Sequence, residues 1–195
     1  MNVQEFLKSA KYTGAKKGSA GEESEWLHFC DFKLRGEHLQ MVETRILGTA
    51  HDSNSVSIPA EPGRYVVECR VMSYGDDRRI SRMRVRPQDT GVELGTSAGA
   101  IGVDEGGIAI TDVDILASFV EEHEDEYEEW IEDAWFGKSA TKTVGVLRWK
   151  RAKTEIPYAG GGFGDGMYKV FPLIAGKQAV GLEVEFIAAG TKYPF

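Results

Sequence analysis

The sequence predicts an α+β domain built mainly from antiparallel β-sheet, either a sandwich or a curved sheet, with one long amphipathic helix near residues 112–136. Two observations lead to this fold class. About nine short segments alternate apolar and polar residues, which is typical of strands with one buried face. One segment has apolar residues three and four positions apart, as an amphipathic helix does. Many short strands and a single helix favour a helix that covers one face or edge of an antiparallel sheet.

The first half of the chain supplies the clearest strand signals. Residues 26–34 alternate in the sequence WLHFCDFKL, and residues 38–47 form a second strand-like run. The strongest hairpin signal covers residues 63–87, where two alternating runs flank a Gly-Asp-Asp turn. Proline cannot donate a hydrogen bond to a strand ladder, so Pro62 and Pro87 are expected at the boundaries of these strands.

Shorter elements are predicted in the second half. Two brief strands are expected at residues 102–104 and 107–110, on either side of a glycine-containing turn. The predicted helix at 112–136 follows them. A strand at 143–152 and a final hairpin at 169–190 complete the sheet.

Length and composition favour one cytoplasmic domain. A chain of 195 residues with 42% apolar and 28% charged residues is typical of a single globular domain spanning 1–195. Residues 1–24 are rich in Gly, Ser and charge and are predicted to form a mobile or peripheral N-terminal arm. No segment has the apolar length of a signal peptide or a membrane span, which predicts a cytoplasmic protein. Cys30 and Cys69 lie in strand-like segments without CxxC spacing, so free thiols are expected.

The charge of the chain indicates what kind of partner it prefers. The net charge of −8 argues against direct binding of nucleic acid, because such proteins neutralise phosphates with basic residues. It favours a basic protein partner instead. The four histidines lack zinc-like spacing, so no metal site and no cofactor are predicted.

An acidic run within the predicted helix is the first candidate interaction site. Residues 121–133 contain nine carboxylates in thirteen positions and no Lys or Arg. Like charges four positions apart destabilise a helix, so a run without compensating basic residues suggests that the carboxylates serve another purpose. The run is therefore interpreted either as a surface for a basic partner or as the solvated face of the helix. The candidate partner-binding residues are Glu121, Glu124, Asp125, Glu128 and Glu129.

A glycine-rich loop suggests a second candidate site. Residues 159–166, AGGGFGDG, precede an apolar, strand-like run. Glycine permits close approach of the backbone to a ligand, and carboxylates beneath the loop suit a cation or acid–base chemistry. The candidate ligand-binding residues are Asp104, Asp112, Asp165 and Tyr168. Turn formation and helix capping explain Asp112, together with its neighbours Glu105 and Asp114, without any ligand, and a cap on the turn of its loop is the equal alternative for Asp165.

Two catalytic or nucleotide-binding motifs are incomplete. The glycine-rich loop is followed by extended sequence containing Pro172, whereas a phosphate-binding loop is followed by a helix. The GTSAG sequence around Ser97 matches the serine elbow of hydrolases, but the glycines after it argue against the helix that the elbow requires. Neither motif predicts an enzyme.

Several blocks of the sequence, taken in order, resemble a family of uncharacterised bacterial proteins classified as a domain of unknown function. Its pattern is P-G-x-Y, then V-D-x-G ending in Asp, then G-x-G-D-G-x-Y before a last hairpin. The matching positions are Pro62, Gly63, Tyr65, Val103, Asp104, Gly106, Asp112, Gly162, Gly164, Asp165, Gly166 and Tyr168. The resemblance implies a family-like core over residues 59–186 and implies no activity.

These observations favour a binding protein over an enzyme. The sequence predicts a non-enzymatic protein-binding module, for example an immunity-like or antitoxin-like protein that engages a basic partner through its acidic helix. The alternative is a small-ligand- or metal-binding enzyme with a carboxylate site beneath the loop at 160–166. The cognate partner and the oligomeric state are left open by the sequence.

Overall fold

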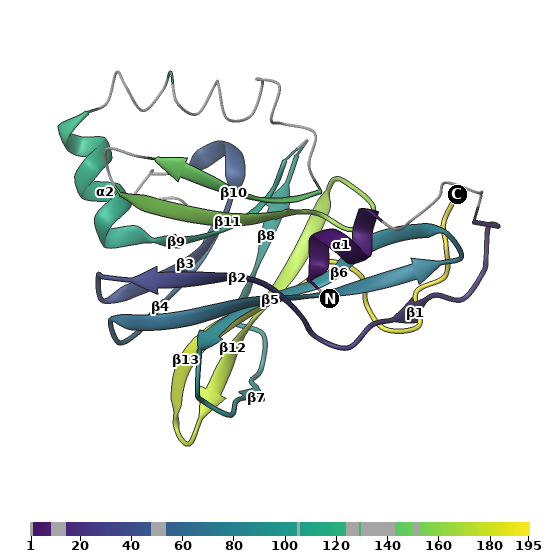
Figure 1. Cartoon of the computed structure of the whole chain (residues 1–195), viewed down its shortest axis with the longest axis horizontal. Helices are drawn as coiled ribbons and strands as arrows, with labels where there is room; N and C mark the ends of the chain where they lie inside the picture. Colours follow the sequence, from purple (N-terminus) through teal and green to yellow (C-terminus); the bar gives the residue numbers. More distant parts are fainter. Residues whose placement is uncertain are drawn as a thin grey trace.

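The computed structural model describes residues 2–8, 15–47, 54–104, 106–123, 129, 143–149 and 153–195. Within these residues the chain forms thirteen β-strands and two short α-helices with defined bounds (Figure 1). The prediction of mainly antiparallel sheet is confirmed, because every strand pair is antiparallel. The two sheets curl around a common core as a half-barrel (Figure 1).

The larger sheet has the order β1-β5-β6-β13-β12-β7, with β2 also paired to β5 and β8 also paired to β12. Its strands are β1 (Glu22–Glu23), β2 (Leu27–Leu34), β5 (Gly63–Tyr74), β6 (Asp77–Pro87), β7 (Glu93–Leu94), β8 (Gly99–Val103), β12 (Gly166–Ala175) and β13 (Gln178–Glu185). The predicted hairpin at 63–87 is β5 and β6, and the final predicted hairpin is β12 and β13.

The smaller sheet has the order β10-β11-β9-β3-β4. Its strands are β3 (His38–Glu43), β4 (Ser55–Pro59), β9 (Gly107–Asp112), β10 (Val144–Trp149) and β11 (Thr154–Gly160). A 3-10 turn, η1 (Thr44–Ile46), follows β3, and the two α-helices are α1 (Val3–Lys8) and α2 (Val113–Glu122). None of the described helices has the length or the apolar character to span a membrane.

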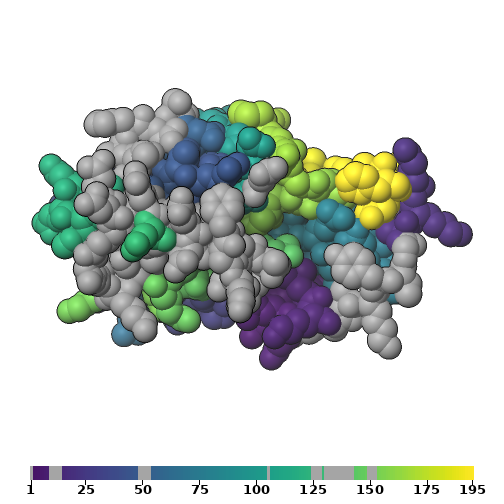
Figure 2. Space-filling model, turned by 90° about the horizontal axis from the view of Figure 1, so that it is seen from above, coloured from purple at the N-terminus to yellow at the C-terminus, as the bar shows by residue number. Residues whose placement is uncertain are grey.

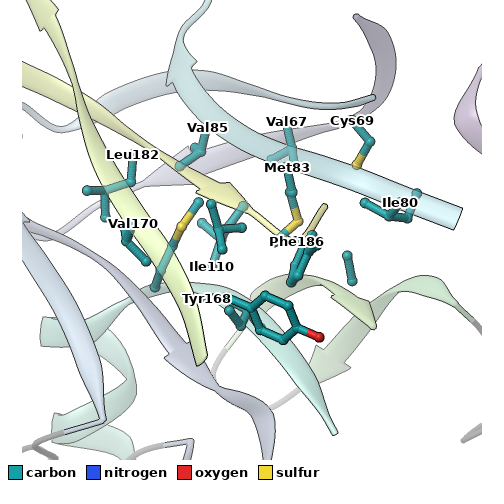
Figure 3. Close-up of a cluster of buried hydrophobic side chains, with 14 of the residues drawn as sticks. Val67, Cys69, Ile80, Met83, Val85, Ile110, Tyr168, Val170, Leu182 and Phe186 are labelled. Atoms are coloured by element: carbon teal, nitrogen blue, oxygen red, sulfur yellow. The ribbon is translucent and has the colours of Figure 1, made fainter. Parts of the chain in front are cut away.

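The core lies between the two sheets. Alternation along β5 and β6 turns Val67 and Met83 inward, where they meet Leu182 of β13 and Ile110 of β9 (Figure 3). Burial of such side chains is the main force that holds sheet against sheet. Cys69 also faces this core, and both cysteines are free thiols.

One side chain joins the two sheets at their open seam. Asn54, just before β4, donates from its amide nitrogen to the Gly102 carbonyl oxygen of β8 over 2.7 Å. Its amide oxygen accepts from the Gly102 N–H over 2.6 Å. The Asn54 side chain therefore pairs with β8 as a neighbouring strand would.

Both end segments of the chain pack against folded elements. Val3 of α1 is fully buried in the core cluster. Gly18 and Ser19 exchange backbone hydrogen bonds with Tyr193, so the purple N-terminal segment and the yellow C-terminal segment lie side by side at one end of the molecule (Figure 2). The helix α2 lies at the opposite end of the long axis (Figures 1 and 2).

The prediction of one long helix over residues 112–136 is wrong. The helix α2 ends at Glu122, and His123 has φ −143° and ψ 44°, outside the helical region. Glu121 and Glu122 occupy its last turn, where the helix dipole places partial negative charge and further carboxylates follow in the sequence. This repulsion opposes continuation of the helix. Apart from Glu129, residues 124–136 lie outside the described part of the chain.

Candidate functional site

Asp112, one of the predicted ligand residues, has a structural role. It is the last residue of β9 and the N-cap of α2, and its Oδ1 accepts from the Ile115 N–H over 3.3 Å. Its Oδ2 accepts from the N–H groups of Arg35 and Gly36 over 2.7 and 2.9 Å. The carboxylate is 3% exposed and fixes the turn between β2 and β3 to the start of α2.

Two of the other predicted residues lie opposite each other. Val103 of β8 pairs with Gly166 of β12, so the next positions outward are Asp104 and Asp165. Both side chains are exposed. Asp112 lies at the far end of β9, about 17 Å along the strand from Gly107 at roughly 3.3 Å per residue. Asp104 and Asp165 therefore lie just beyond the paired ends of β8 and β12, and Asp112 lies at the end of a different strand, β9. Across the described residues, no three His, Cys, Asp or Glu side chains are placed to hold a metal ion.

Tyr168, the fourth predicted residue, closes the glycine-rich loop. Its hydroxyl donates to the Gly164 carbonyl oxygen, four residues earlier, and its ring packs edge-on against Phe186 with centroids 5.2 Å apart. A Cβ on Gly161 would lie 2.7 Å from the ring carbon Cε2 of Tyr168, so only glycine fits beneath the ring. Burial raises the pKa of the phenol. The hydroxyl is therefore engaged within the loop.

The same arrangement occurs at Tyr65. Its hydroxyl donates to the Glu61 carbonyl oxygen, again four residues earlier, over 2.8 Å. The residue is 3% exposed, and its ring packs edge-on against Phe32 with centroids 6.4 Å apart. A tyrosine that bonds back to the chain just before its strand is known as a tyrosine corner in β-sandwiches. The P-G-x-Y and G-D-G-x-Y blocks of the sequence are thus two such corners.

A cleft of about 790 Å³ lies beside Tyr65, at the end of the sheets where β4 stops and β5 starts. Four separate segments contribute to it: the β2–β3 turn, the β4–β5 connection, the end of β6 with the residues after it, and the start of β13. The lining residues are Glu37, Pro59, Ala60, Glu61, Pro62, Tyr65, Pro87, Thr90, Gln178, Ala179 and Val180.

The cleft is apolar with an acidic rim. Three of the six prolines of the chain line it, together with Ala60, Ala179 and Val180. Glu37 and Glu61 are exposed carboxylates on the rim, and the described lining contains no Lys or Arg. Apolar walls with a few placed polar groups are the usual composition of a ligand site. This cleft therefore suits a ligand that has both apolar surface and positive charge.

A buried carboxylate lies at the other end of the smaller sheet. Glu43, the last residue of β3, is 5% exposed, and its Oε1 has no hydrogen-bond partner in the described part of the chain. Its Oε2 accepts from the Arg45 N–H over 3.1 Å. Burial raises the pKa of Glu43 from its usual 4.5 to about 7, and the nearby Asp104 carboxylate acts in the same direction while Arg45 opposes it. Glu43 is thus protonated over a wider pH range than a surface carboxylate.

The remaining candidates divide between described and undescribed residues. Glu121 and Glu129 are exposed, whereas Glu124, Asp125 and Glu128 lie outside the described residues. The Ser97 hydroxyl donates to the Gly99 carbonyl oxygen over 3.0 Å, and β8 follows it rather than a helix. The hydrolase elbow is therefore absent at Ser97, as its sequence context predicts.

Sequence reasoning did not find the cleft. It identified Pro62 and Pro87 as strand boundaries. The occurrence of several prolines at strand ends was the one feature of the sequence that could have pointed to the cleft. The sequence did not show that four strand ends converge on one side of Tyr65.

No protein-family model, no curated protein and no solved structure matches this chain. The resemblance to uncharacterised bacterial proteins therefore stays a prediction.

Proposed function

We propose that the chain is a non-enzymatic binding module that holds a basic segment of a protein partner in the cleft beside Tyr65. One observation carries this proposal: a formed cleft of about 790 Å³ with an apolar lining, two rim carboxylates and no basic residue among the described lining. Ligand sites typically measure roughly 300 to 1,000 Å³, so the cleft accommodates several side chains of a peptide. Immunity-like and antitoxin-like proteins belong to this class.

Prolines and one side-chain hydrogen bond restrain the backbone that forms the walls of the cleft. Proline fixes its own φ angle, and Pro59 and Pro87 are the terminal residues of paired strands. The Tyr65 hydroxyl holds the backbone of Glu61 in place. A preformed site loses little conformational entropy on binding, which favours affinity.

Charge supports a basic occupant. The net charge of −8 attracts a basic protein from a distance, and Glu37 and Glu61 provide counter-charges at the cleft itself. The Asp114 carboxylate of α2 accepts from the Glu37 N–H over 2.7 Å, so α2 begins beside this rim. Glu121 follows about 10 Å further along the helix axis, at roughly 1.5 Å rise per residue. The predicted acidic surface would therefore guide the partner toward the cleft.

The alternative prediction, an enzyme with a carboxylate site beneath the loop at 160–166, receives less support. The Asp112 carboxylate and the Tyr168 hydroxyl are both engaged in bonds within the chain. Asp104 and Asp165 alone then have to provide the site.

The test uses a set of fluorescein-labelled heptapeptides that contain two Lys or Arg residues among Pro, Ala and Val. Anisotropy should show saturable binding to some of them, and peptides with Glu in place of each basic residue should not bind. Glu61→Lys should weaken binding about tenfold, since it reverses a rim charge. The Tyr65 corner bonds to the backbone of Glu61 and is retained in this variant.

The matched control is Glu22→Lys. Glu22 is exposed and pairs with Ser73, near the opposite end of β5 from the cleft, and the change in net charge is identical. Equal weakening by Glu22→Lys and Glu61→Lys would show a general charge effect and contradict the cleft as the site. Absence of saturable binding to every basic peptide would overturn the proposed function.

A further inference from the structure

A second, smaller hollow adjoins the cleft. It measures about 370 Å³, and Thr90 lines both spaces. Its lining residues are Arg84, Arg86, Asp89, Thr90, Gly91 and Val92. The two arginines make this hollow chemically different from the cleft, which has no basic residue among its described lining.

Arg86 builds the wall of the hollow. Its Nη1 donates to the carbonyl oxygens of Pro87, Gln88 and Thr90 over 3.3, 3.1 and 3.3 Å. Its Nε donates to Glu68 Oε2 over 2.9 Å. These hydrogen bonds hold the chain after β6 in a bend, and they occupy the Nε and Nη1 donors of Arg86.

Arg84 has hydrogen-bonding capacity to spare. Its Nε donates to Glu68 Oε2 over 2.8 Å, and Trp26 stacks on its guanidinium with the ring centroid 3.9 Å away. Trp26 and Glu68 therefore fix the plane and one edge of the group. Within the described residues, its two terminal nitrogens, Nη1 and Nη2, donate to no acceptor. A guanidinium held in this way presents its remaining donors as a fork, the geometry that a carboxylate accepts through both oxygens.

We propose that this hollow binds a carboxylate, and that the ligand of the whole site is the C-terminal end of a basic peptide. The apolar and basic side chains would occupy the cleft, and the terminal carboxylate would bind Arg84 beyond Thr90. This proposal rests on the proposed function for the identity of the ligand.

The local charge favours a carboxylate over a phosphate group. Glu68 lies between Arg84 and Arg86, and Asp89 is an exposed carboxylate on the lining. These two negative charges equal the two positive charges of the arginines. A singly charged group is therefore preferred to one with nearly two charges.

The first test compares peptides that differ only at the C-terminus. Each basic heptapeptide that binds is made with a free carboxylate and as the C-terminal amide. The free acid should bind about tenfold tighter than the amide, as a charge-assisted bidentate pair provides. Arg84→Lys keeps the charge and loses the fork, so the ratio of the two affinities should fall severalfold. The exposed Arg148→Lys on β10 is the control and should keep the ratio.

The second test does not depend on the peptides. Titration with sodium acetate, followed by amide chemical shifts, should move the resonances of Gly91 and Val92 in the wild type and not in Arg84→Lys. Equal binding of acid and amide would overturn the carboxylate site while leaving the proposed function standing. If no peptide binds, the proposed function fails and the acetate titration decides the hollow: absent shifts overturn it, and shifts that need Arg84 support it. Thermal melts of each variant check that it is folded.

Discussion

Two tyrosines make the same bond at opposite ends of the larger sheet, and Tyr65 lines the cleft described above whereas Tyr168 does not. Tyr65 lies near the start of β5 and Tyr168 near the start of β12, and the ladder β5-β6-β13-β12 makes these strands antiparallel to each other. Each hydroxyl donates to a backbone carbonyl four residues earlier. The difference between the two ends must therefore come from the loops that the tyrosines hold.

The two loops differ in how closely their backbones approach the core. At the Tyr168 end, a Cβ on Gly162 would lie 2.6 Å from the Ile187 side chain, so the loop has collapsed onto its neighbours. At the Tyr65 end, Pro59 ends β4 and Pro62 lies just before β5, and both residues line the open cleft. Glycine lets a loop fill its own space, and proline keeps that space available for a ligand.

The largest effect is expected from Gly161→Ala at the Tyr168 end. The added Cβ would lie 2.7 Å from the tyrosine ring and 2.9 Å from the Gly164 carbonyl oxygen. The tyrosine ring or the Gly164 backbone must move to make room for the added Cβ. We therefore expect a loss of about 2 to 3 kcal/mol in the free energy of unfolding, measured by urea denaturation. Gly91→Ala is the control, because its Cβ would meet nothing within 4 Å. A loss no larger than that of Gly91→Ala would contradict the collapsed loop.

The buried Glu43 should make the stability of the protein depend on pH. Its pKa in the folded protein is about 7, above the usual 4.5, so the folded state holds its proton more tightly than the unfolded chain. Ionisation therefore costs stability, and the cost grows from pH 4.5 to pH 7 and is constant above pH 7. Glu43→Gln removes a group that must ionise, so we expect it to stabilise the protein by about 1 to 2 kcal/mol at pH 8 and hardly at all near pH 4.5.

Urea denaturation of both proteins at the two pH values measures this difference. Glu155→Gln, an exposed carboxylate on β11, is the control and should show little dependence on pH. A stabilisation by Glu43→Gln that is the same at pH 4.5 and pH 8 would rule out a raised pKa.

Removing one hydroxyl at each end sharpens the comparison. Tyr65→Phe and Tyr168→Phe each leave a backbone carbonyl without its donor, so each should cost about 1 kcal/mol of stability. Only Tyr65→Phe should also weaken binding of the basic peptides, because only Tyr65 lines the cleft. Equal loss of peptide binding in both variants would place the ligand elsewhere.

The fold was largely predictable and the site was not, for different physical reasons. Alternation in β5 and β6 is a local pattern, so the long hairpin and its inward residues could be inferred from the sequence. The apolar spacing of 112–136 was equally regular, but that spacing does not show that the helix ends at Glu122. The cleft depends on which strand ends meet, and that is a property of the pairing order in both sheets.

The same distinction applies to the predicted carboxylate site. Asp112 has the sequence context of an N-cap, and capping accounts for its position at the start of α2. Its carboxylate accepts hydrogen bonds from the backbone N–H groups of Arg35, Gly36 and Ile115. Asp104 and Asp165 are sixty-one positions apart, and only the register of β8 with β12 places them opposite each other. Two carboxylates at neighbouring strand ends do not by themselves form a ligand site, and the described residues provide no third ligand for a metal ion.

Asp165 and Glu61 are exposed carboxylates in the segments that Tyr168 and Tyr65 hold, and they should behave differently. Asp165→Ala should change stability by less than about 0.5 kcal/mol, as exposed positions usually do, and should leave peptide binding unchanged. Glu61→Ala should be equally mild for stability and should weaken peptide binding, since Glu61 contributes rim charge to the cleft. Denaturation and anisotropy on both variants separate the two roles. If Asp165→Ala abolished binding and Glu61→Ala did not, the peptide would bind at the Tyr168 end of the sheet and not in the cleft at the Tyr65 end.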